Sequence, residues 1–526
     1  MSFFRFFLLW IIGCFNLVAA YADDVNILDF GANTEVANNA PFIQKAIDHC
    51  AATGGGYVYV PAGTFVSGTI FLRDNVRLQL HLNAIIQGSN HFYEYKANAL
   101  IAAEDVRNAS IEGDGTIDGQ GGCTAWHLGN IRIVGDGTRP HLVVFNRCHN
   151  MAVTGISLIN AAQWTFRMTE CDGVRVQGIH VYSHVNHNND GLDIESKNVL
   201  ISDCVIDSDD DALCFKSGVS GNVNSEYGHD VENITVTNCI IASNCNAIKF
   251  GTASDGRFRN ITISNCVIRK TSENNIRFWG NLRGSSDHTN ISGIALEVVD
   301  GGLMDQVVIS NITMRDIQTP LFIRLGNRKT ASSIRNIILS GITAYNTSLM
   351  SSSITGIPGH NVENVTLRDF VLYYTGGADA DDATRPVPEK EKDYPENRMF
   401  GPSLPAYGLY VRHARNVTIE NFQCYTLQPD PRPAFEFDDV QNLSLNNFQI
   451  SPPSSDQPLI RLVQSSDIQL SGFRAPQSAI PLFLHASGEQ CRNISVVRND
   501  FTKVTKVVDC ESSLKKQIWV NNNKEK

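Results

Sequence analysis

Two groups of aspartates flank one β-branched segment of the chain. Asp190 precedes the segment Ser196–Ile206, and Asp209, Asp210 and Asp211 follow it. If the chain makes one full coil between the two groups, their carboxyl groups meet on one wall. Facing carboxylates can hydrolyse a glycosidic bond, one as general acid and another as base. The stretch therefore predicts a hydrolytic site, with solvated turn aspartates or a calcium cluster as the alternatives.

A degenerate repeat supplies the coils that would bring these carboxylates together. From Tyr57 onward, short β runs alternate with turns rich in Gly, Asn and Asp. A frame seen in NVLISDCVID, NITVTNCIIA and NITISNCVIR recurs along the chain, at a spacing of roughly 20–35 residues, which is typical of a solenoid. This all-β pattern predicts a single right-handed parallel β-helix, in which each coil buries its apolar face against its neighbours.

One amphipathic helix is expected before the repeat begins. Asn39 can cap it, Pro41 falls in its first turn, and apolar residues follow at helical spacing. The glycines of Gly54–Gly56 end it. We expect this helix to cover the open N-terminal end of the stack, because terminal repeats need a cap.

A charged, proline-rich segment interrupts the repeat at residues 376–405. Long loops on solenoids often line the binding face, and a disordered surface loop is the alternative. The aromatic residues Tyr394 and Phe400 favour an ordered loop. The sequence thus predicts one β-helix domain over residues 23–526 with an insertion near residues 376–405.

Composition and the N-terminus bound the class of protein. The chain has 526 residues, 42% of them hydrophobic, and a net charge of −11, which disfavours nucleic acid as a partner. Residues 1–22 resemble an export signal, with Arg5 before a short apolar run and a cleavage site at Ala20–Ala22. Lipoprotein anchoring at Cys14 is the alternative. We expect an exported monomer, secreted or periplasmic, without a membrane span.

The cysteines point to packing rather than to a metal. Cys204, Cys239 and Cys266 recur in one context, which predicts a buried stack of small side chains. Because the sequence has no C-x-x-C pair, we expect no metal and no cofactor. Cys491 and Cys510 could form a disulfide.

Asparagines recur at one position of the repeat, where many of them form Asn-x-Ser/Thr sequons. Such sequons can accept glycans, but the repeat frame favours a stack of asparagines at a turn. The sequons are Asn233, Asn260, Asn311, Asn364 and Asn416.

Three short motifs support a family resemblance. Residues 188–191, Asn-Asn-Asp-Gly, resemble the Asn-Thr-Asp-Gly motif of glycoside hydrolase family 28, the polygalacturonases and rhamnogalacturonases. Residues 209–212, which continue into Phe-Lys-Ser-Gly at 215–218, resemble the family's Gly-Asp-Asp-Cys segment, and residues 29–32 match its usual start. The resemblance covers most of residues 25–320 and implies a parallel β-helix and an inverting hydrolysis.

The resemblance also implies roles for single residues. Asp210 is expected to act as the general acid, and Asp190 and Asp211 to hold the attacking water. An inverting pair has its carboxyl groups about 6.5–9.5 Å apart, with room for one water. Asn188 and Asp193 are expected to contact the sugar, and Asp209 could serve in either a supporting or a sugar-binding role.

Two departures from the family pattern bear on the substrate. The family's Gly-His-Gly segment falls at residues 243–247, where Cys245 replaces the histidine, and its Arg-Ile-Lys segment falls at residues 295–297, without a cation. A glutamate at position 297 would repel a uronate, which favours the rhamnogalacturonan side over homogalacturonan, with an exo-type polygalacturonase as the alternative. Other cations could bind the substrate in place of the missing ones: Lys216, Lys249, Arg277, Arg324, Arg328, Arg412 and His413. Cys245 is a further substrate-binding candidate, and Trp279 could stack on a sugar ring or pack in the core.

Two other functions stay open on this scaffold. A polysaccharide lyase would need an Arg or Lys base and often calcium. A non-catalytic polysaccharide-binding β-helix is compatible with the missing histidine. The aspartates at hydrolase spacing favour a glycoside hydrolase that acts on an acidic plant-type polysaccharide or oligosaccharide.

Overall fold

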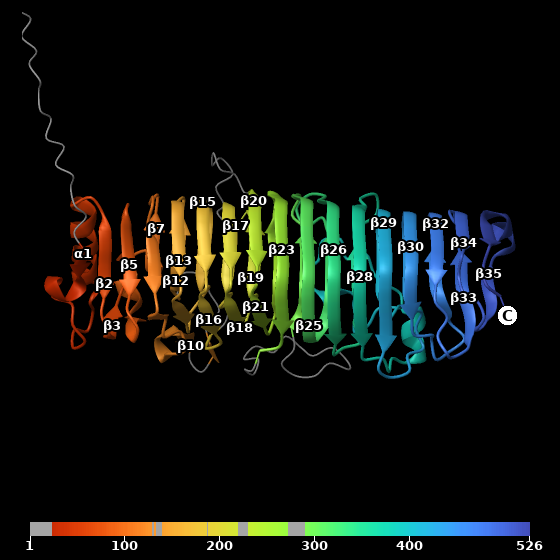
Figure 1. The fold of residues 1–526 in the computed structure, drawn as a ribbon, viewed down its shortest axis with the longest axis horizontal. Coiled ribbons are helices and arrows are strands. Elements are labelled where there is room, and N and C mark those ends of the chain that lie inside the picture. The colour runs from red at the N-terminus through yellow and green to blue at the C-terminus, as the bar shows by residue number, and fades with distance from the viewer. Residues whose placement is uncertain are drawn as a thin grey trace, which may run out of the picture.

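The protein is an elongated stack of parallel β-coils (Figure 1). The computed structural model describes residues 24–128, 131–132, 139–186, 188–218, 230–271 and 290–525, so the expected export signal lies outside the described residues. The helix α1 (Ala40–Ala52) covers one end, and β36 (Ile518–Asn521) forms the other. The predicted parallel β-helix with an N-terminal helix is therefore confirmed. In the described part of the chain, no helix has the length and apolarity needed to cross a bilayer.

Each strand pairs in parallel with the strands one coil before and one coil after it. The strand β17 (Leu192–Ser202) lies between β15 (Phe166–Gln177) on one side and both β19 (Leu213–Ser217) and β20 (Val231–Thr237) on the other. This in-register stacking repeats every side chain position at the next coil, about 4.8 Å away. A residue type chosen at one position therefore forms a row along the molecule.

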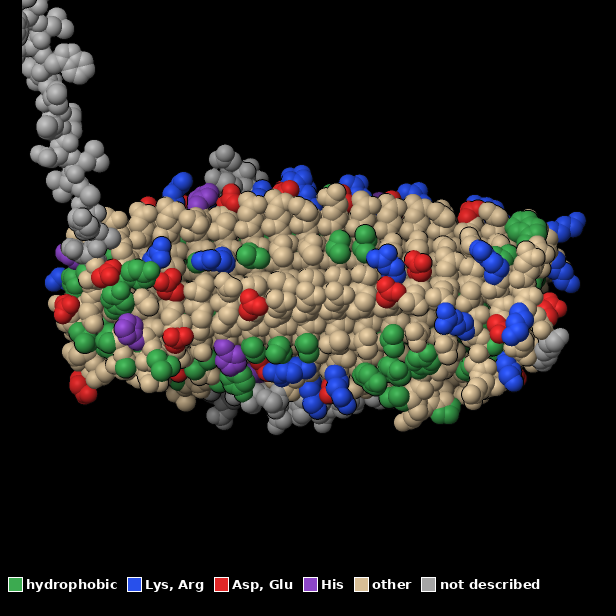
Figure 2. Space-filling view, viewed as in Figure 1, with side chains coloured by type: hydrophobic (Ala, Val, Ile, Leu, Met, Phe, Trp, Pro, Cys, Tyr) green, Lys and Arg blue, Asp and Glu red, His purple; other side chains and the backbone are tan. Residues whose placement is uncertain are grey.

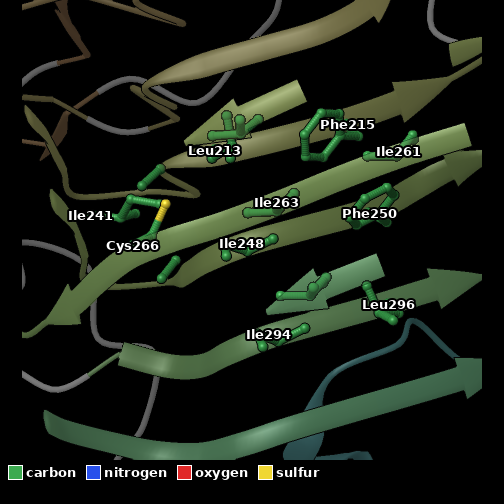
Figure 3. Close-up of a cluster of buried hydrophobic side chains, with 14 of the residues drawn as sticks. Leu213, Phe215, Ile241, Ile248, Phe250, Ile261, Ile263, Cys266, Ile294 and Leu296 are labelled. Atoms are coloured by element: carbon green, nitrogen blue, oxygen red, sulfur yellow. The ribbon is translucent and has the colours of Figure 1, made fainter. Parts of the chain in front are cut away.

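The inward rows make the core. Ile194, Phe215, Phe250 and Leu296 are paired in register on successive coils, and all four are fully buried. Figure 3 shows the last three of them in the core. The rings of Phe215 and Phe250 stack with their centroids 4.4 Å apart. Burial of each such side chain stabilises the fold by about 1.5–3 kcal/mol. This continuous core explains why the β-branched repeat dominates the sequence.

The turn rows are polar. The Asn233 side chain donates to the Asn198 side chain over 2.9 Å, and the Asn260 side chain donates to Asn233 over 2.7 Å. All three have positive φ angles, near 55°, which asparagine tolerates better than most residues. A second ladder joins Asn336, Asn364, Asn416 and Asn442 in the same way. The predicted asparagine stack is confirmed.

The cysteine stack is also confirmed, but the disulfide is not. Cys204, Cys239 and Cys266 are buried, and each thiol lies within 3.1–3.3 Å of a backbone carbonyl two residues earlier. Cys491 and Cys510 are both free thiols. They do not meet because the register places Cys510 opposite Ala486, not opposite Cys491.

The insertion is ordered and packs along the coils. It joins β28 (Val362–Tyr374) to β29 (Leu409–Thr426) and contains two short 3₁₀ helices, η4 (Ala380–Thr384) and η5 (Asn397–Phe400). Phe400 is buried in a second apolar cluster with Ala295, Phe322, Met350, Leu404 and Tyr410. On the face shown in Figure 2, acidic and basic side chains are scattered along the stack rather than gathered in one patch.

Candidate active site

The aspartates meet because the same turn of the coil recurs three times. Asp190 lies between β16 (His180–Ser183) and β17, and Asp210 and Asp211 lie between β18 (Val205–Ser208) and β19. Cys245 occupies the equivalent turn, between β21 (Ile240–Ser243) and β22 (Asn246–Ser254). The structure thus places one coil between the two aspartate groups, as the sequence predicts.

Glycine at position 191 makes this stacking possible. The Gly191 amide donates to the carbonyl of Asp211 over 2.9 Å. A Cβ atom at position 191 would lie 2.4 Å from the carbonyl oxygen of Ala212. The Asn-Asn-Asp-Gly motif therefore contains both the catalytic candidate, Asp190, and the residue that lets two coils approach closely, Gly191.

A cavity of about 270 Å³ opens over the carboxylates. Most of its lining residues come from the stacked turns and from the strands that follow them, and Tyr394 and Glu396 come from the insertion. The lining residues are Trp164, Asn188, Asp190, Asp210, Asp211, Lys216, Cys245, Asn246, Lys249, Gly251, Thr252, Ala253, Tyr394 and Glu396. The three predicted catalytic aspartates therefore share one cavity.

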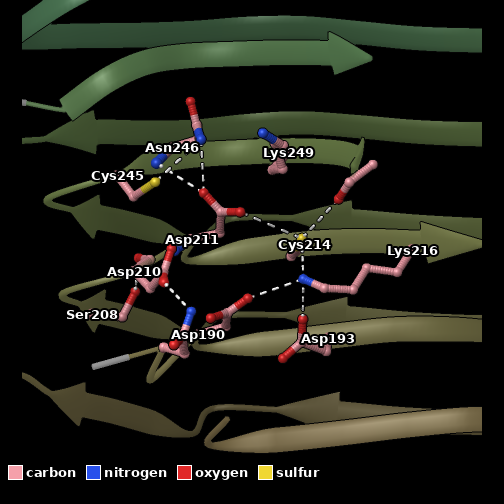
Figure 4. A network of polar contacts seen from close by, with 12 residues as sticks. Asp190, Asp193, Ser208, Asp210, Asp211, Cys214, Lys216, Cys245, Asn246 and Lys249 are labelled. Carbon is pink, nitrogen blue, oxygen red and sulfur yellow. Dashed lines mark hydrogen bonds and ion pairs between the residues drawn. The ribbon is translucent and has the colours of Figure 1, made fainter. Parts of the chain in front are cut away.

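The carboxyl groups lie close together (Figure 4). The nearest oxygens of Asp190 and Asp211, and those of Asp210 and Asp211, lie within 4.8 Å of one another. This separation is shorter than the roughly 6.5–9.5 Å expected between the carboxyl groups of an inverting acid and base. Hydrogen bonds from a water to a carboxylate are about 2.5–2.7 Å long, so one water can bridge such a pair. One oxygen of Asp210 accepts from the Asp211 amide over 2.9 Å, and the other accepts from the Asn188 side chain over 3.3 Å.

Lys216 is the cation nearest to Asp190. Its ammonium lies 2.9 Å from the Asp190 carboxylate, 2.6 Å from that of Asp193 and 2.9 Å from the Cys214 sulfur (Figure 4). The same ammonium lies 4.8 Å from the centroid of the Trp164 ring. Burial raises the pKa of Asp190 well above its ordinary range, and Lys216 opposes this shift.

Asp211 has a different environment. One of its oxygens accepts from the Asn246 amide over 3.1 Å and from the Asn246 side chain over 2.7 Å. Burial favours protonation of this carboxyl, but the charges of Lys249 and Lys216 and the bonds from Asn246 hold its pKa below the ordinary value. Asp211 therefore stays ionised, as a base that activates water requires.

Lys249 brings a second cation to the cavity. It stands in register with Cys214 on the preceding coil and forms a 2.8 Å ion pair with Glu297, and both side chains are almost fully buried. Burial raises the pKa of Glu297 to about 7, although Lys249 opposes the shift. Glu297 is not a lining residue of the cavity. The expected repulsion of a uronate by this glutamate is therefore countered by Lys249, which lines the cavity.

The other cations proposed from the sequence do not line the cavity. Arg324 is buried and donates to the carbonyls of Glu389 and Lys390 over 2.7 and 3.0 Å. Arg412 donates to the Val387 carbonyl and pairs with Asp438, and His413 bonds to Asp439 and Glu389. Arg328 pairs with Asp300. These residues anchor the insertion, whereas Arg277 and Trp279 lie outside the described residues.

Trp164, Asn246 and Glu396 line the cavity and were not identified from the sequence. Trp164 precedes β15, one coil before Asp190, and no local motif marks it. Only an alignment of successive coils could have placed it over Lys216. Asp209 accepts from Asn244 over 2.8 Å and is not a lining residue, which leaves it in a supporting position.

Two groups of acidic and thiol side chains in the cavity could be considered as metal ligands, but lysine already bonds to part of them. Asp190, Asp211 and Cys214 place ligand atoms within 4.8 Å of one another, and so do Asp210, Asp211 and Cys245. In the first group the Lys216 ammonium already bonds to Asp190 and Cys214. A buried thiol is also a poor ligand for calcium, which prefers oxygen. We assign no metal to this cavity.

Comparisons with known proteins agree with this geometry. The model of the family "Glycosyl hydrolases family 28" matches residues 50–390. A probable polygalacturonase of Vitis vinifera is 24% identical over 69% of this chain and 77% of its own length, and an endo-polygalacturonase of Pectobacterium carotovorum is 24% identical over 63% and 83%. Both relatives are thus matched over most of their length.

Solved structures share the fold. An exopolygalacturonase from Thermotoga maritima superposes with a TM-score of 0.59 at 20% identity, over 76% of this chain and 91% of that structure. The tailspike protein of E. coli bacteriophage HK620 superposes with a TM-score of 0.58 at 12% identity, over 94% and 80%. At these identities the likeness concerns the fold alone.

Proposed function

The chain belongs to glycosyl hydrolases family 28, and from this membership we propose that it hydrolyses galacturonate-containing pectic chains with inversion at the anomeric carbon. The observation that carries the proposal is the cavity in which Asp190, Asp210 and Asp211 lie beside two buried lysines. Carboxylates supply the acid and the base, and lysines attract an acidic sugar.

In the proposed mechanism, Asp210 protonates the leaving glycosidic oxygen. Asp211 and Asp190 hold the attacking water, which can bridge their nearest oxygens. Asp211 takes the proton of that water, because Lys249, Lys216 and Asn246 stabilise its ionised form. Asn188 positions the acid through its hydrogen bond to Asp210.

Lys249 supports a galacturonate at the cleavage site. Its ammonium lies in the cavity beside Asp211 and within 6.0 Å of the Tyr394 ring centroid. Glu297 alone would repel a uronate and favour the rhamnogalacturonan side, but Lys249 neutralises its charge. The relatives named above are polygalacturonases. We therefore favour cleavage next to galacturonate, with the neighbouring sugar to be decided by experiment.

The insertion supports attack at a chain end. Tyr394 and Glu396 line the cavity, and Arg324 and Arg412 bind backbone carbonyls of the loop that carries them. A fixed wall beside the carboxylates leaves room for few sugars in that direction. An exo-acting enzyme would use such a wall to accept only the terminal residue.

Product analysis tests this function. The protein would be incubated with homogalacturonan, rhamnogalacturonan and oligomers of each, and the products sized over time. Early release of single galacturonates supports exo-polygalacturonase action, whereas cleavage of rhamnogalacturonan alone assigns a rhamnose to the leaving side. Proton NMR of the first product reports its anomeric configuration, and a retained configuration would exclude inversion. An unsaturated product that absorbs in the ultraviolet would identify a lyase instead.

A further inference from the structure

One lysine serves two buried carboxylates beside the catalytic turn. Asp190 and Asp193 are 4% and 2% exposed, and the Lys216 ammonium contacts both within 2.9 Å. Asp193 belongs to β17 and is paired in register with Cys214 on the next coil. Lys216 follows Cys214 by two residues on the same strand, so its side chain lies on the same face of the sheet. This pairing places two negative charges against one positive charge.

The ionised form of Asp190 has Lys216 as its main stabilising partner, whereas that of Asp211 has several. In the described part of the chain, one oxygen of Asp190 is buried without a hydrogen-bond partner, and the other bonds to Lys216. Asp211 by contrast has Asn246, Lys249 and Lys216. The charge state of Asp190 is therefore sensitive to how Lys216 is shared.

The groups that face this pair come from several elements. Lys216 and Cys214 approach from β19, Asp210 and Asp211 from the turn before it, and Arg167 approaches Asp193 from β15. Trp164 covers the ammonium. Of these groups, Lys216 alone is within ion-pair distance of Asp190.

We propose that Lys216 is a positioning residue whose single charge is divided between Asp190 and Asp193, so that Asp193 controls how readily Asp190 ionises. The proposal rests on the proposed function, in which Asp190 holds the attacking water. Asp193 itself does not line the cavity. It acts on Asp190 through the lysine and through its own charge.

Opposite effects follow for two substitutions. Burial raises the pKa of Asp190, Lys216 lowers it, and the Asp193 charge raises it. In Lys216→Met the favourable charge is lost, so Asp190 ionises only at higher pH. In Asp193→Asn the Lys216 ammonium interacts with Asp190 as its one charged partner of the pair, and the repulsion from the Asp193 carboxylate is lost. Asp190 should therefore ionise at lower pH. A purely structural role would not reverse sign between the two variants.

The pH dependence of kcat/KM tests this reversal. We expect the acidic limb of Lys216→Met to move upward by about 1–3 pH units, the usual effect of one close opposite charge, and that of Asp193→Asn to move downward. Lys216→Arg keeps the charge and should leave the limb near its wild-type position. Shifts of the same sign, or no shift in Asp193→Asn, would overturn the proposal.

A second measurement separates this proposal from the proposed function. Infrared titration of ¹³C-aspartate-labelled protein, with Asp190→Asn as the subtraction reference, reports the ionisation of Asp190 without substrate. The same opposite shifts are expected there. If no pectic substrate is cleaved but the shifts occur, the function fails and the charge sharing stands. If cleavage occurs without the shifts, the charge sharing fails. Asp193→Asn decides the matter even if Lys216→Met does not fold.

Discussion

Two turns of the β-helix stack polar side chains on successive coils, and they do so in opposite ways. The asparagine ladder, formed by Asn336, Asn364, Asn416 and Asn442, repeats one neutral group. The catalytic turn, formed by Asp190, Asp210 and Asp211, brings together three acids. Each asparagine donates to its neighbour and can accept from the next, so the ladder satisfies itself.

The catalytic turn cannot satisfy itself, because carboxylates only accept hydrogen bonds and repel one another. It is buried, and it relies on Lys216, Lys249 and Asn246, which come from neighbouring strands. Positions where the same residue recurs on successive coils are therefore stabilising ones. A turn where crowded acids replace that residue is less stable and is a candidate catalytic site. Substitutions in the catalytic turn should therefore reduce activity, whereas those in the asparagine ladder should reduce stability alone.

Removal of a catalytic acid should have the largest effect on activity. Asp210→Asn and Asp211→Asn should each lower kcat by about 10²–10⁴-fold, the range typical of general acid or base groups. Asp211→Asn should also lose some stability at neutral pH, because Lys249, Lys216 and Asn246 stabilise the ionised carboxylate in the folded state. Steady-state rates on the best substrate and thermal melts measure both effects.

Asp209→Asn is the matched control, since Asp209 is adjacent and buried but does not line the cavity. It should keep most of the activity. A fully active Asp210→Asn enzyme would mean that another group is the acid.

The Lys249–Glu297 pair should have the largest effect on stability. Lys249→Met leaves a buried glutamate without its cation, and loss of one partner of a buried pair costs about 3–5 kcal/mol. Burial already raises the pKa of Glu297 to about 7, and loss of Lys249 raises it further. A raised carboxyl pKa favours the folded state at low pH, so the stability of this variant should fall as pH rises from near 4.5 through 7.

Urea denaturation at pH 5, 6, 7 and 8 measures the free energy of unfolding. The double variant Lys249→Met with Glu297→Gln carries neither charge and should recover much of the loss at high pH. A pH-independent deficit in Lys249→Met would show that packing, not charge, causes the instability.

The contrast between the two turns also explains what the sequence could reveal. The repeat frame predicted the β-helix, the asparagine ladders and the cysteine stack, because in-register coils turn a local pattern into a spatial row. The clustering of Asp190, Asp210 and Asp211 followed from the same rule. These features depend only on the spacing between neighbouring coils.

Contacts whose partners are separated in the sequence by turns of variable length were not predictable in this way, even where the strands pair directly. The Lys249–Glu297 pair and the position of Trp164 depend on the number of residues in each turn, which varies along the chain. Arg324, Arg412 and His413 were proposed as sugar-binding groups because they are cations near the insertion. The structure shows that they bind the backbone and carboxylates of the insertion itself. Their charge was visible in the sequence, but the path of the loop was not.

The wall of the cavity should affect binding more than chemistry. Tyr394 lines the cavity and its ring lies 5.8 Å from Arg328 and 6.0 Å from Lys249. Tyr394→Ala should raise KM about 5- to 30-fold, the equivalent of about 1–2 kcal/mol of lost aromatic contacts, with a smaller change in kcat. Tyr93→Ala is the matched control, because Tyr93 is also well exposed and lies outside the cavity. If both variants bind substrate like the wild type, the insertion does not form the terminal wall.

The asparagine ladder should show the smallest effect, confined to stability. Asn364 has a φ of 55° and donates to Asn336 over 2.8 Å, and Asn416 donates to it over 2.9 Å. Asn364→Ala loses these bonds and strains the left-handed backbone, at a cost of about 1–2 kcal/mol. Asn364→Gly loses the same bonds without the strain and should be less destabilised. Neither variant should change kcat/KM, because the ladder does not reach the cavity. Equal losses in Ala and Gly would show that the hydrogen bonds, rather than the backbone conformation, explain why asparagine recurs there.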